Sequence, residues 1–143
     1  MIDQGHKAYS SVLFAAGSGS LMAAACNKIF LTLADKAIFQ YGLELFLSDS
    51  DCKQVILVGK AEEKSYFTDY LSDRVCFVVG GAERQDSVRH ALKEVSEDAV
   101  MIHDGARPFV TLSELAALKA YNNAILAVPV KDTIKQVNHQ EQI

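Results

Sequence analysis

The sequence predicts an α/β protein with a Rossmann-like, doubly wound and mostly parallel sheet. Two observations support this class. Short apolar runs rich in β-branched residues alternate with segments of helical periodicity, which is typical of βαβ units. Each unusual glycine-rich or acidic stretch comes directly after one of these runs. Because the ligands of such sheets lie beyond the carboxyl ends of the strands, where the winding reverses, we expect the functional site there.

The apolar runs are short and β-branched, so each is predicted to be a buried strand, joined to the next by a right-handed crossover. They are residues 11–16, 54–59, 74–80, 99–104 and 124–130.

Four helices are expected between the strands, over residues 37–47, 62–71, 84–95 and 112–120. Residues 84–95 have the clearest pattern, because their apolar side chains recur at i, i+3, i+4 and i+7. At the start of the last helix, Thr111 and Glu114 have the spacing of a capping box, in which a hydroxyl and a carboxylate satisfy free backbone amides.

The composition describes one domain, residues 1–143, of ordinary globular character. Half of the residues are hydrophobic, 22% are charged and the formal net charge is -4. Without a basic block, a protein that wraps nucleic acid is excluded, although a single bound nucleotide is not. The three cysteines follow no metal-ligand spacing, and no run approaches the ~20 apolar residues of a membrane span. We therefore expect a cytoplasmic protein with no membrane partner.

The first strand-end loop is AAGSGS, residues 15–20. Gly17 and Gly19 let the backbone turn and aim its amides at one point, which makes a nest for phosphate oxygens. Lys28 could fold back onto such an anion as a point charge. The dinucleotide fingerprint would need glycine at Met22, and the P-loop signature is missing. A plain glycine turn with a solvated lysine therefore stays open as the alternative.

The second loop is GGAERQDSVRH, residues 80–90. Gly80 and Gly81 permit a close backbone approach, and the hydroxyl of Ser87 could meet a base or a ribose. The alternative, which capping statistics favour, is a turn followed by a helix cap in which Glu83 and Asp86 answer the helix dipole.

The third loop is IHDGARPF, residues 102–109, and it is the most informative. Asp104 suits Mg²⁺, which prefers oxygen ligands and often bridges substrate phosphates. Arg107 suits a phosphate, which a guanidinium can clamp through two hydrogen bonds. The alternative is a salt bridge between these two residues that ties the loop, and we interpret His103 as a structural, hydrogen-bonded histidine. The last stretch, VPVKDTIK, is polar enough to bind a substrate or only to turn.

Taken together and in register, five stretches closely resemble the 2-C-methyl-D-erythritol 4-phosphate cytidylyltransferases of the non-mevalonate isoprenoid pathway. They are AAGSGS, the Asn27–Lys28 pair, GGAERQDSVR, IHDGARPF and AILAVPVKDTIK, and they cover nearly the whole chain. The related enzymes that make CDP-ribitol are similar too, but GGAERQDSVR and VPVKDTIK look more like the methylerythritol branch.

The resemblance implies a fold of the nucleotide-diphospho-sugar transferase type and a reaction of CTP with methylerythritol phosphate that needs Mg²⁺. It implies triphosphate binding by the first loop, at Ala15, Ala16, Gly17, Ser18 and Gly19. Lys28 would offset charge in the transition state. Cytosine and ribose would be read by Gly80, Gly81, Ala82 and Ser87. Asp104 would meet the metal, with Gly105 beside it, and Arg107 and Thr133 would position the sugar phosphate.

Two departures from the family pattern shape the expectation. Leu21 stands where the family has an arginine, so one transition-state cation is missing. The family also continues past this chain through a β-arm that makes a homodimer, so we expect the C-terminal part and this arm to be largely absent here. The alternatives are a ribitol-5-phosphate cytidylyltransferase or a non-catalytic CTP-binding relative.

Overall fold

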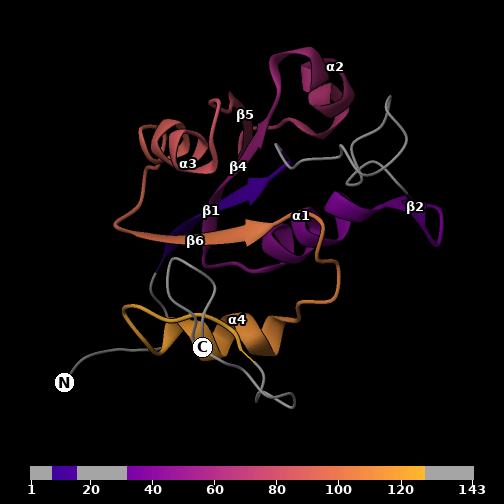
Figure 1. Ribbon diagram of the computed structural model, residues 1–143. Helices are drawn as coiled ribbons and strands as arrows, with labels where there is room; N and C mark the ends of the chain where they lie inside the picture. Colours follow the sequence, from indigo (N-terminus) through magenta and orange to yellow (C-terminus); the bar gives the residue numbers. More distant parts are fainter. Residues whose placement is uncertain (1–7, 16–31, 128–143) are drawn as a thin grey trace, which may run out of the picture.

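Four parallel strands form the central sheet of the protein. The structure is a computed structural model, and it describes residues 8–15 and 32–127 (Figure 1). The sheet order is β5-β4-β1-β6, and all three pairings are parallel. These strands are β1 (Tyr9–Phe14), β4 (Cys52–Gly59), β5 (Val75–Val79) and β6 (Ala99–Asp104).

Helices cover both faces of this sheet, as a doubly wound fold requires. α1 (Ile38–Ser48), α2 (Lys64–Phe67) and α4 (Leu112–Lys119) pack with Tyr9 and Leu13 of β1 in one apolar cluster. α3 (Arg84–Leu92) packs on the opposite face. The two clusters follow from the alternation of side chains along a strand. Since the chain crosses to the second face before it enters β6, the winding reverses between β1 and β6, as predicted for a doubly wound sheet.

Most predicted elements are present with shifts at their ends. The strand predicted over 99–104 is β6, and the helices predicted over 37–47, 84–95 and 112–120 are α1, α3 and α4. Residues 62–71 do not form one helix. They are divided among α2 and two 3₁₀ turns, η2 (Ala61–Glu63) and η3 (Thr68–Tyr70).

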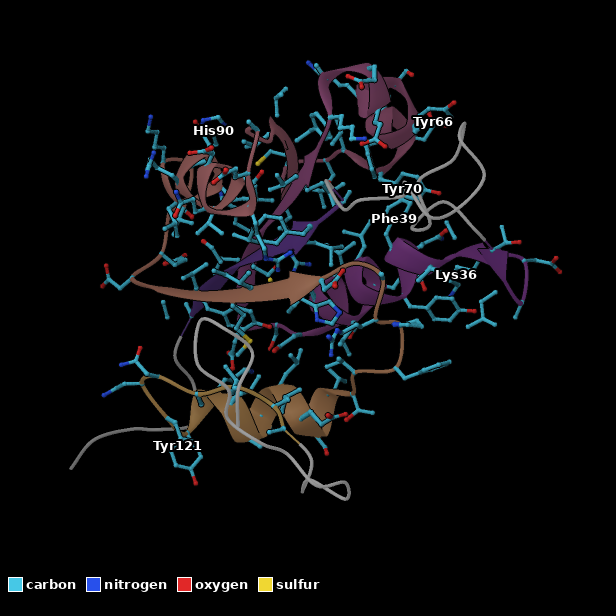
Figure 2. All side chains as sticks on the ribbon, in the orientation of Figure 1. Lys36, Phe39, Tyr66, Tyr70, His90 and Tyr121 are labelled. Carbon is cyan, nitrogen blue, oxygen red and sulfur yellow. The ribbon has the colours of Figure 1, made fainter. Side chains whose placement is uncertain are left out.

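This broken segment is held by aromatic packing rather than by a long helix. Phe39 of α1 makes an edge contact with Phe67, at 5.1 Å between ring centres. It makes a second edge contact with Tyr70, at 4.9 Å (Figure 2). Phe67 also stacks on Phe77 of β5. Two 3₁₀ turns and the four-residue helix α2 thus join β4 to β5.

The strand predicted over 124–130 is wrong where the structure describes it. Residues 124–127 belong to no strand and are exposed, with Ile125 87% exposed. An apolar run becomes a strand only when a sheet edge pairs with it, and none of the described strands pairs here. Residues 128–130 lie outside the described part.

A two-stranded hairpin that the sequence did not predict precedes α1. β2 (Thr32–Leu33) and β3 (Lys36–Ala37) pair in antiparallel fashion. Ala34 and Asp35, which form the turn, have positive φ angles of 53° and 65°. Two such residues match the type I′ turn that joins short antiparallel strands.

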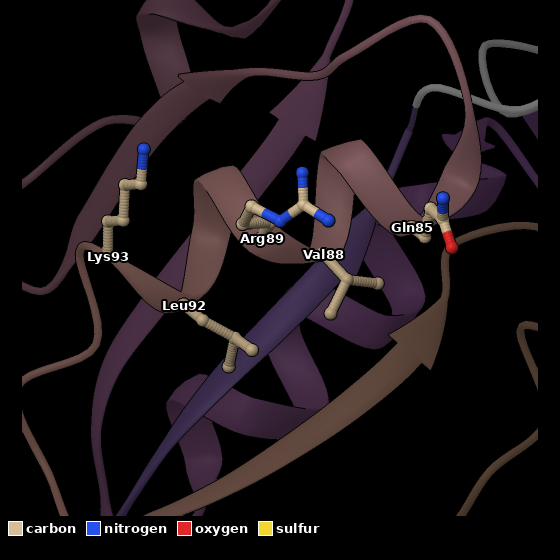
Figure 3. A pocket seen from close by; sticks show the side chains of 5 residues that line it. All are labelled: Gln85, Val88, Arg89, Leu92 and Lys93. Carbon is tan, nitrogen blue, oxygen red and sulfur yellow. The ribbon is translucent and has the colours of Figure 1, made fainter.

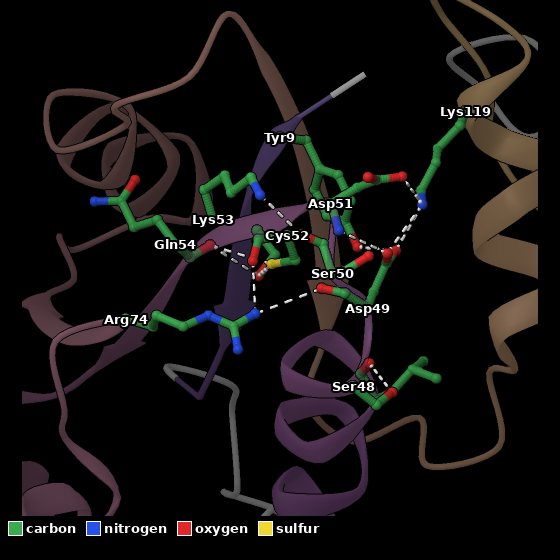
Figure 4. Close-up of polar contacts among 12 residues, drawn as sticks. Tyr9, Ser48, Asp49, Ser50, Asp51, Cys52, Lys53, Gln54, Arg74 and Lys119 are labelled. Atoms are coloured by element: carbon green, nitrogen blue, oxygen red, sulfur yellow. Dashed lines mark hydrogen bonds and ion pairs between the residues drawn. The ribbon is translucent and has the colours of Figure 1, made fainter. Parts of the chain in front are cut away.

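An ionic network joins α4 to the amino end of the sheet (Figure 4). The ammonium group of Lys119 lies 2.8 Å from Asp49 and 2.9 Å from Asp51, and the hydroxyl of Tyr9 donates to Asp49 at 2.8 Å. The side chains of Lys119 and Asp49 are only 12% and 9% exposed. α4 is therefore anchored at the end of the sheet opposite to the expected site.

None of the helices in the described ranges has the length and apolar character needed to cross a membrane.

Candidate functional site at the carboxyl ends of the strands

The loop after β6 lies directly against the end of β1. The backbone amide of Gly105 donates to the carbonyl oxygen of Phe14 at 3.0 Å. A Cβ atom on Gly105 would lie 2.7 Å from that same oxygen, closer than such atoms approach. Glycine at this position therefore lets the Asp104 loop meet the end of β1, where the winding of the sheet reverses.

Asp104 and Arg107 belong to one tight turn. The Oδ1 atom of Asp104 accepts a hydrogen bond from the amide of Ala106 at 3.0 Å, and the amide of Arg107 donates to the carbonyl of Asp104 at 3.1 Å. The guanidinium Nε of Arg107 is 3.9 Å from Oδ2 of Asp104, and its side chain is 78% exposed. This pair is too long for a hydrogen bond and too exposed to stabilise much, so both groups remain accessible to an anion or a cation.

His103 supports this turn from the α1 face of the sheet. Its Nε2 atom lies 2.9 Å from the carbonyl oxygen of Arg107, which can only accept, so Nε2 donates. The ring packs edge-on against Phe46 and close to Gly42. Burial lowers the pKa of His103, against the opposing effect of its bond to the Arg107 carbonyl. His103 is thus the hydrogen-bonded structural histidine that the sequence predicts.

The loop before α3 is built as a helix cap. Glu83 is the N-cap of α3 and forms a capping box with Asp86. Ser87 is 2% exposed, and its hydroxyl accepts from the amide of Gly81 at 3.0 Å. A Cβ on Gly81 would lie 2.3 Å from Cβ of Asp86, so this turn requires glycine.

The hydroxyl of Ser87 therefore stabilises the loop through its bond with Gly81. This agrees with the alternative interpretation of the loop as a turn followed by a helix cap. Its contact with cytosine or ribose stays a prediction. The residues that could face a nucleotide here are Gly80, Gly81 and Ala82, whose backbone follows the end of β5.

Ala15 follows β1 directly, is buried, and donates its amide to the carbonyl of Val58 at 2.5 Å. The first loop thus starts in the sheet between β1 and β4. The other predicted residues of the first loop and of the last stretch lie outside the described residues, and their roles stay predictions. These are Ala16, Gly17, Ser18, Gly19, Leu21, Lys28 and Thr133.

Asp104 is the described carboxylate best placed for a metal. Among the described residues, no group of three or more His, Cys, Asp or Glu side chains could hold a metal ion. A Mg²⁺ ion that is bound mainly by substrate phosphates and water needs only one or two protein carboxylates. The donor set therefore fits a cation that arrives with a nucleotide, whereas it would not fit a permanently held metal.

A hollow of about 440 Å³ lies elsewhere, beside α3 (Figure 3). It is lined by Gln85, Val88, Arg89 and Leu92 of α3 and by Lys93, which directly follows this helix. Because it contains none of the predicted site residues, it does not locate the site.

Arg84 is a residue that sequence reasoning missed. Its guanidinium carbon lies 4.4 Å from the centre of the Phe14 ring, at the end of β1. Its position in the first turn of a helix after a glycine loop was a weak signal, whereas nothing in the sequence indicates the contact with Phe14.

A parallel sheet that reverses its winding between β1 and β6, with polar loops gathered at that point, defines the class of Rossmann-like α/β proteins. Residues 10–143 match the family described as IspD, 2-C-methyl-D-erythritol 4-phosphate cytidylyltransferase. The chain belongs to this family.

Curated relatives carry the same name. The enzyme of Bacillus mycoides is 44% identical over 139 residues, which are 90% of this chain and 62% of the relative. The enzyme of Halalkalibacterium halodurans is 43% identical and is covered to 61%. The chain thus spans less than two thirds of the length of these relatives.

Solved structures agree on the fold. The 4-diphosphocytidyl-2C-methyl-D-erythritol synthase of Anaerococcus prevotii has a TM-score of 0.76 at 23% identity, over 95% of this chain and 61% of that one. The cytidylyltransferase of Thermus thermophilus has a TM-score of 0.67 at 26% identity, over 94% and 61%. The predicted family and the predicted Rossmann-like fold are both confirmed.

Proposed function

We propose that this chain is a cytidylyltransferase that joins CTP to 2-C-methyl-D-erythritol 4-phosphate, giving 4-diphosphocytidyl-2-C-methyl-D-erythritol and pyrophosphate. Family membership over residues 10–143 and the names of the curated relatives support this activity. The structural observation that carries it is the Asp104–Arg107 turn, which a hydrogen bond holds at the end of β1 where the glycine loop begins.

The chemistry asks for positioning and charge compensation. An oxygen of the sugar phosphate forms a bond to the α-phosphorus of CTP, while the bond from that phosphorus to its bridging oxygen breaks and its electron pair leaves with pyrophosphate. The attacking phosphate is already an anion, so no general base is needed. Alignment of two anions and stabilisation of the developing charge therefore supply most of the rate.

The described residues can perform part of this work. The exposed guanidinium of Arg107 can bind the phosphate of methylerythritol phosphate, held in place by the turn that His103 supports. The backbone of Gly80, Gly81 and Ala82 can approach the nucleotide closely. In the first loop, backbone amides would bind the triphosphate and Lys28 would offset its charge.

The Mg²⁺ dependence belongs to the same proposal. Asp104 would hold the ion together with substrate phosphates, and the ion would neutralise phosphate charge. We also propose a homodimer and a cytoplasmic location. Cysteines without ligand spacing are consistent with a reducing compartment.

The test is release of pyrophosphate by the chain, measured with CTP, methylerythritol phosphate and Mg²⁺ together and with each omitted in turn. We expect release only when all three are present. Equal release with ribitol 5-phosphate would move the substrate assignment to that sugar phosphate. Binding of CTP in calorimetry without any release would show a non-catalytic relative.

Two variants refine the test. Arg107→Gln should raise KM for methylerythritol phosphate by about 10-fold or more, with KM for CTP little changed, because one charged phosphate contact is lost.

Asp104→Asn should weaken the dependence on Mg²⁺ and lower kcat by about 10²-fold. The matched control is Asp86→Asn, which removes a carboxylate from the α3 cap and leaves the β6 turn unchanged.

A further inference from the structure

Arg84 lies over the aromatic ring at the end of β1. Its guanidinium carbon is 4.4 Å from the centre of the Phe14 ring, and Phe14 is the last residue of the strand. A guanidinium that stacks on an aromatic face keeps its N–H donors at its edge, where they can still meet another group. The ring thus orients the cation without using its hydrogen bonds.

Asp104 lies on the same side of the sheet. Phe14 and Asp104 are paired in the register of β1 and β6, and paired residues of parallel strands point to one face. That face is the one covered by α3, because Phe14 packs in the cluster with Ala91 of α3. A cation from α3 and a carboxylate from β6 therefore flank Phe14 at the point where the winding reverses.

The charge of Arg84 is not neutralised by the part of the chain that the structure describes. Arg89 pairs with Asp86, and Arg107 lies near Asp104. No described carboxylate lies within ion-pair distance of Arg84. An exposed guanidinium that no described carboxylate neutralises favours an anion as its partner.

We infer that Arg84 binds the polyphosphate of the nucleotide at the end of β1, on the face of the sheet that α3 covers. The inference rests on the proposed function, which supplies CTP as the anion. A cation from α3 would supply part of the positive charge that an arginine in place of Leu21 would bring.

The experiment compares variants of the chain by calorimetric titration with CTP and Mg²⁺, and with cytidine as a probe that lacks phosphate. Arg84→Gln should weaken CTP binding by about 10- to 100-fold, because a charged hydrogen-bond donor is removed, and should leave cytidine binding unchanged. Arg84→Lys keeps the charge without the planar donors, so we expect an intermediate loss for CTP. The matched control, Arg89→Gln on the same helix, should stay within about twofold of the original chain, as an exposed pair contributes little.

The outcomes separate this inference from the proposed function. Equal CTP affinity of Arg84→Gln and the original chain, with turnover intact in both, would overturn the inference alone. An equal loss for CTP and cytidine would also overturn it, since Arg84 would then only cover Phe14 and shape the loop. If the original chain binds no CTP, the inference and the proposed function fail together.

Discussion

Gly105 connects the geometry of one residue to the whole site. A side chain here would press on the carbonyl oxygen of Phe14, which belongs to the backbone of β1 and cannot move aside cheaply. We expect Gly105→Ala to displace the Asp104 turn, to lower kcat/KM for methylerythritol phosphate by about 10-fold or more, and to reduce the free energy of unfolding by about 1–3 kcal/mol. Pyrophosphate release and urea unfolding measure the two effects. Unchanged kinetics would mean that the turn does not hold substrate.

Leu21 stands where the resemblance to the family leads us to expect an arginine. If Lys28 and the first loop act on the triphosphate, a guanidinium at position 21 adds a second cation to the transition state. Leu21→Arg should then raise kcat by about 10²-fold with little change in the midpoint of unfolding. Steady-state pyrophosphate release measures the gain, and Leu21→Lys controls for the planar donors. An unchanged kcat in Leu21→Arg would show that a cation at position 21 does not limit turnover.

At the scale of elements, the hairpin before α1 contains a turn that its residues do not favour. Ala34 has a φ of 53°, which brings its Cβ close to the following carbonyl. Ala34→Gly should therefore raise the free energy of unfolding by about 0.5–1 kcal/mol. Ala37→Gly is the matched control, because Ala37 has a φ of -59° and the same substitution there should destabilise. Urea unfolding of both variants measures these changes. If both substitutions lower the free energy of unfolding, the turn is not strained.

The elements differ in how far they could be predicted from the sequence. The strands of the sheet and α3 were predictable, because strands buried on both faces give continuous apolar runs and a helix buried on one face gives an apolar stripe. The Ala34–Asp35 turn lacks the Asn-Gly signal of such hairpins, so β2 and β3 were missed. Residues 124–127 show the opposite error, since an apolar run needs a paired edge that lies far away in sequence.

Some features of the site could likewise be predicted from the sequence, and others could not. The approach of Asp104, Gly105 and Arg107 to the end of β1 follows from strand order, and the rule for doubly wound sheets predicted it. The hydrogen bond from the Gly81 amide to the Ser87 hydroxyl and the position of Arg84 over the Phe14 ring depend on packing between separate elements. Sequence patterns do not indicate such contacts between residues of different elements.

At the scale of the whole molecule, an ionic network that stabilises the fold and the proposed active site lie at opposite ends of the sheet. Lys119, Asp49, Asp51 and Tyr9 form a nearly buried network at the amino ends of β1 and β4. Burial raises the pKa of Asp49, but hydrogen bonds from Lys119 and Tyr9 outweigh it and lower the pKa overall. Burial lowers the pKa of Lys119, and its bonds to Asp49 and Asp51 outweigh it and raise the pKa. Each ion is therefore favoured in the folded chain.

The directions of these two pKa shifts determine how the free energy of unfolding depends on pH. A carboxyl with a lowered pKa in the folded chain contributes stability that is complete above its ordinary value of 3.8 and is lost as the pH falls below it. An ammonium with a raised pKa contributes stability that is complete below its ordinary value of 10.5 and is lost as the pH rises above it. Between these limits the network should stabilise the fold fully.

Asp49→Asn tests this account without touching the proposed site. Because Lys119 keeps Asp51 as a partner, we expect a loss of about 2–3 kcal/mol at neutral pH rather than the larger loss of a fully orphaned charge. The difference from the original chain should shrink as the pH falls below 3.8, because Asp49 is then protonated in the unfolded chain and, below its lowered pKa, in the folded chain as well. Urea unfolding across this range measures it, and Glu44→Gln, which breaks the exposed pair with Lys36, should change little. A pH-independent loss would assign the effect to packing, and a fall in kcat at temperatures where the variant is folded would show that the two ends of the sheet are coupled.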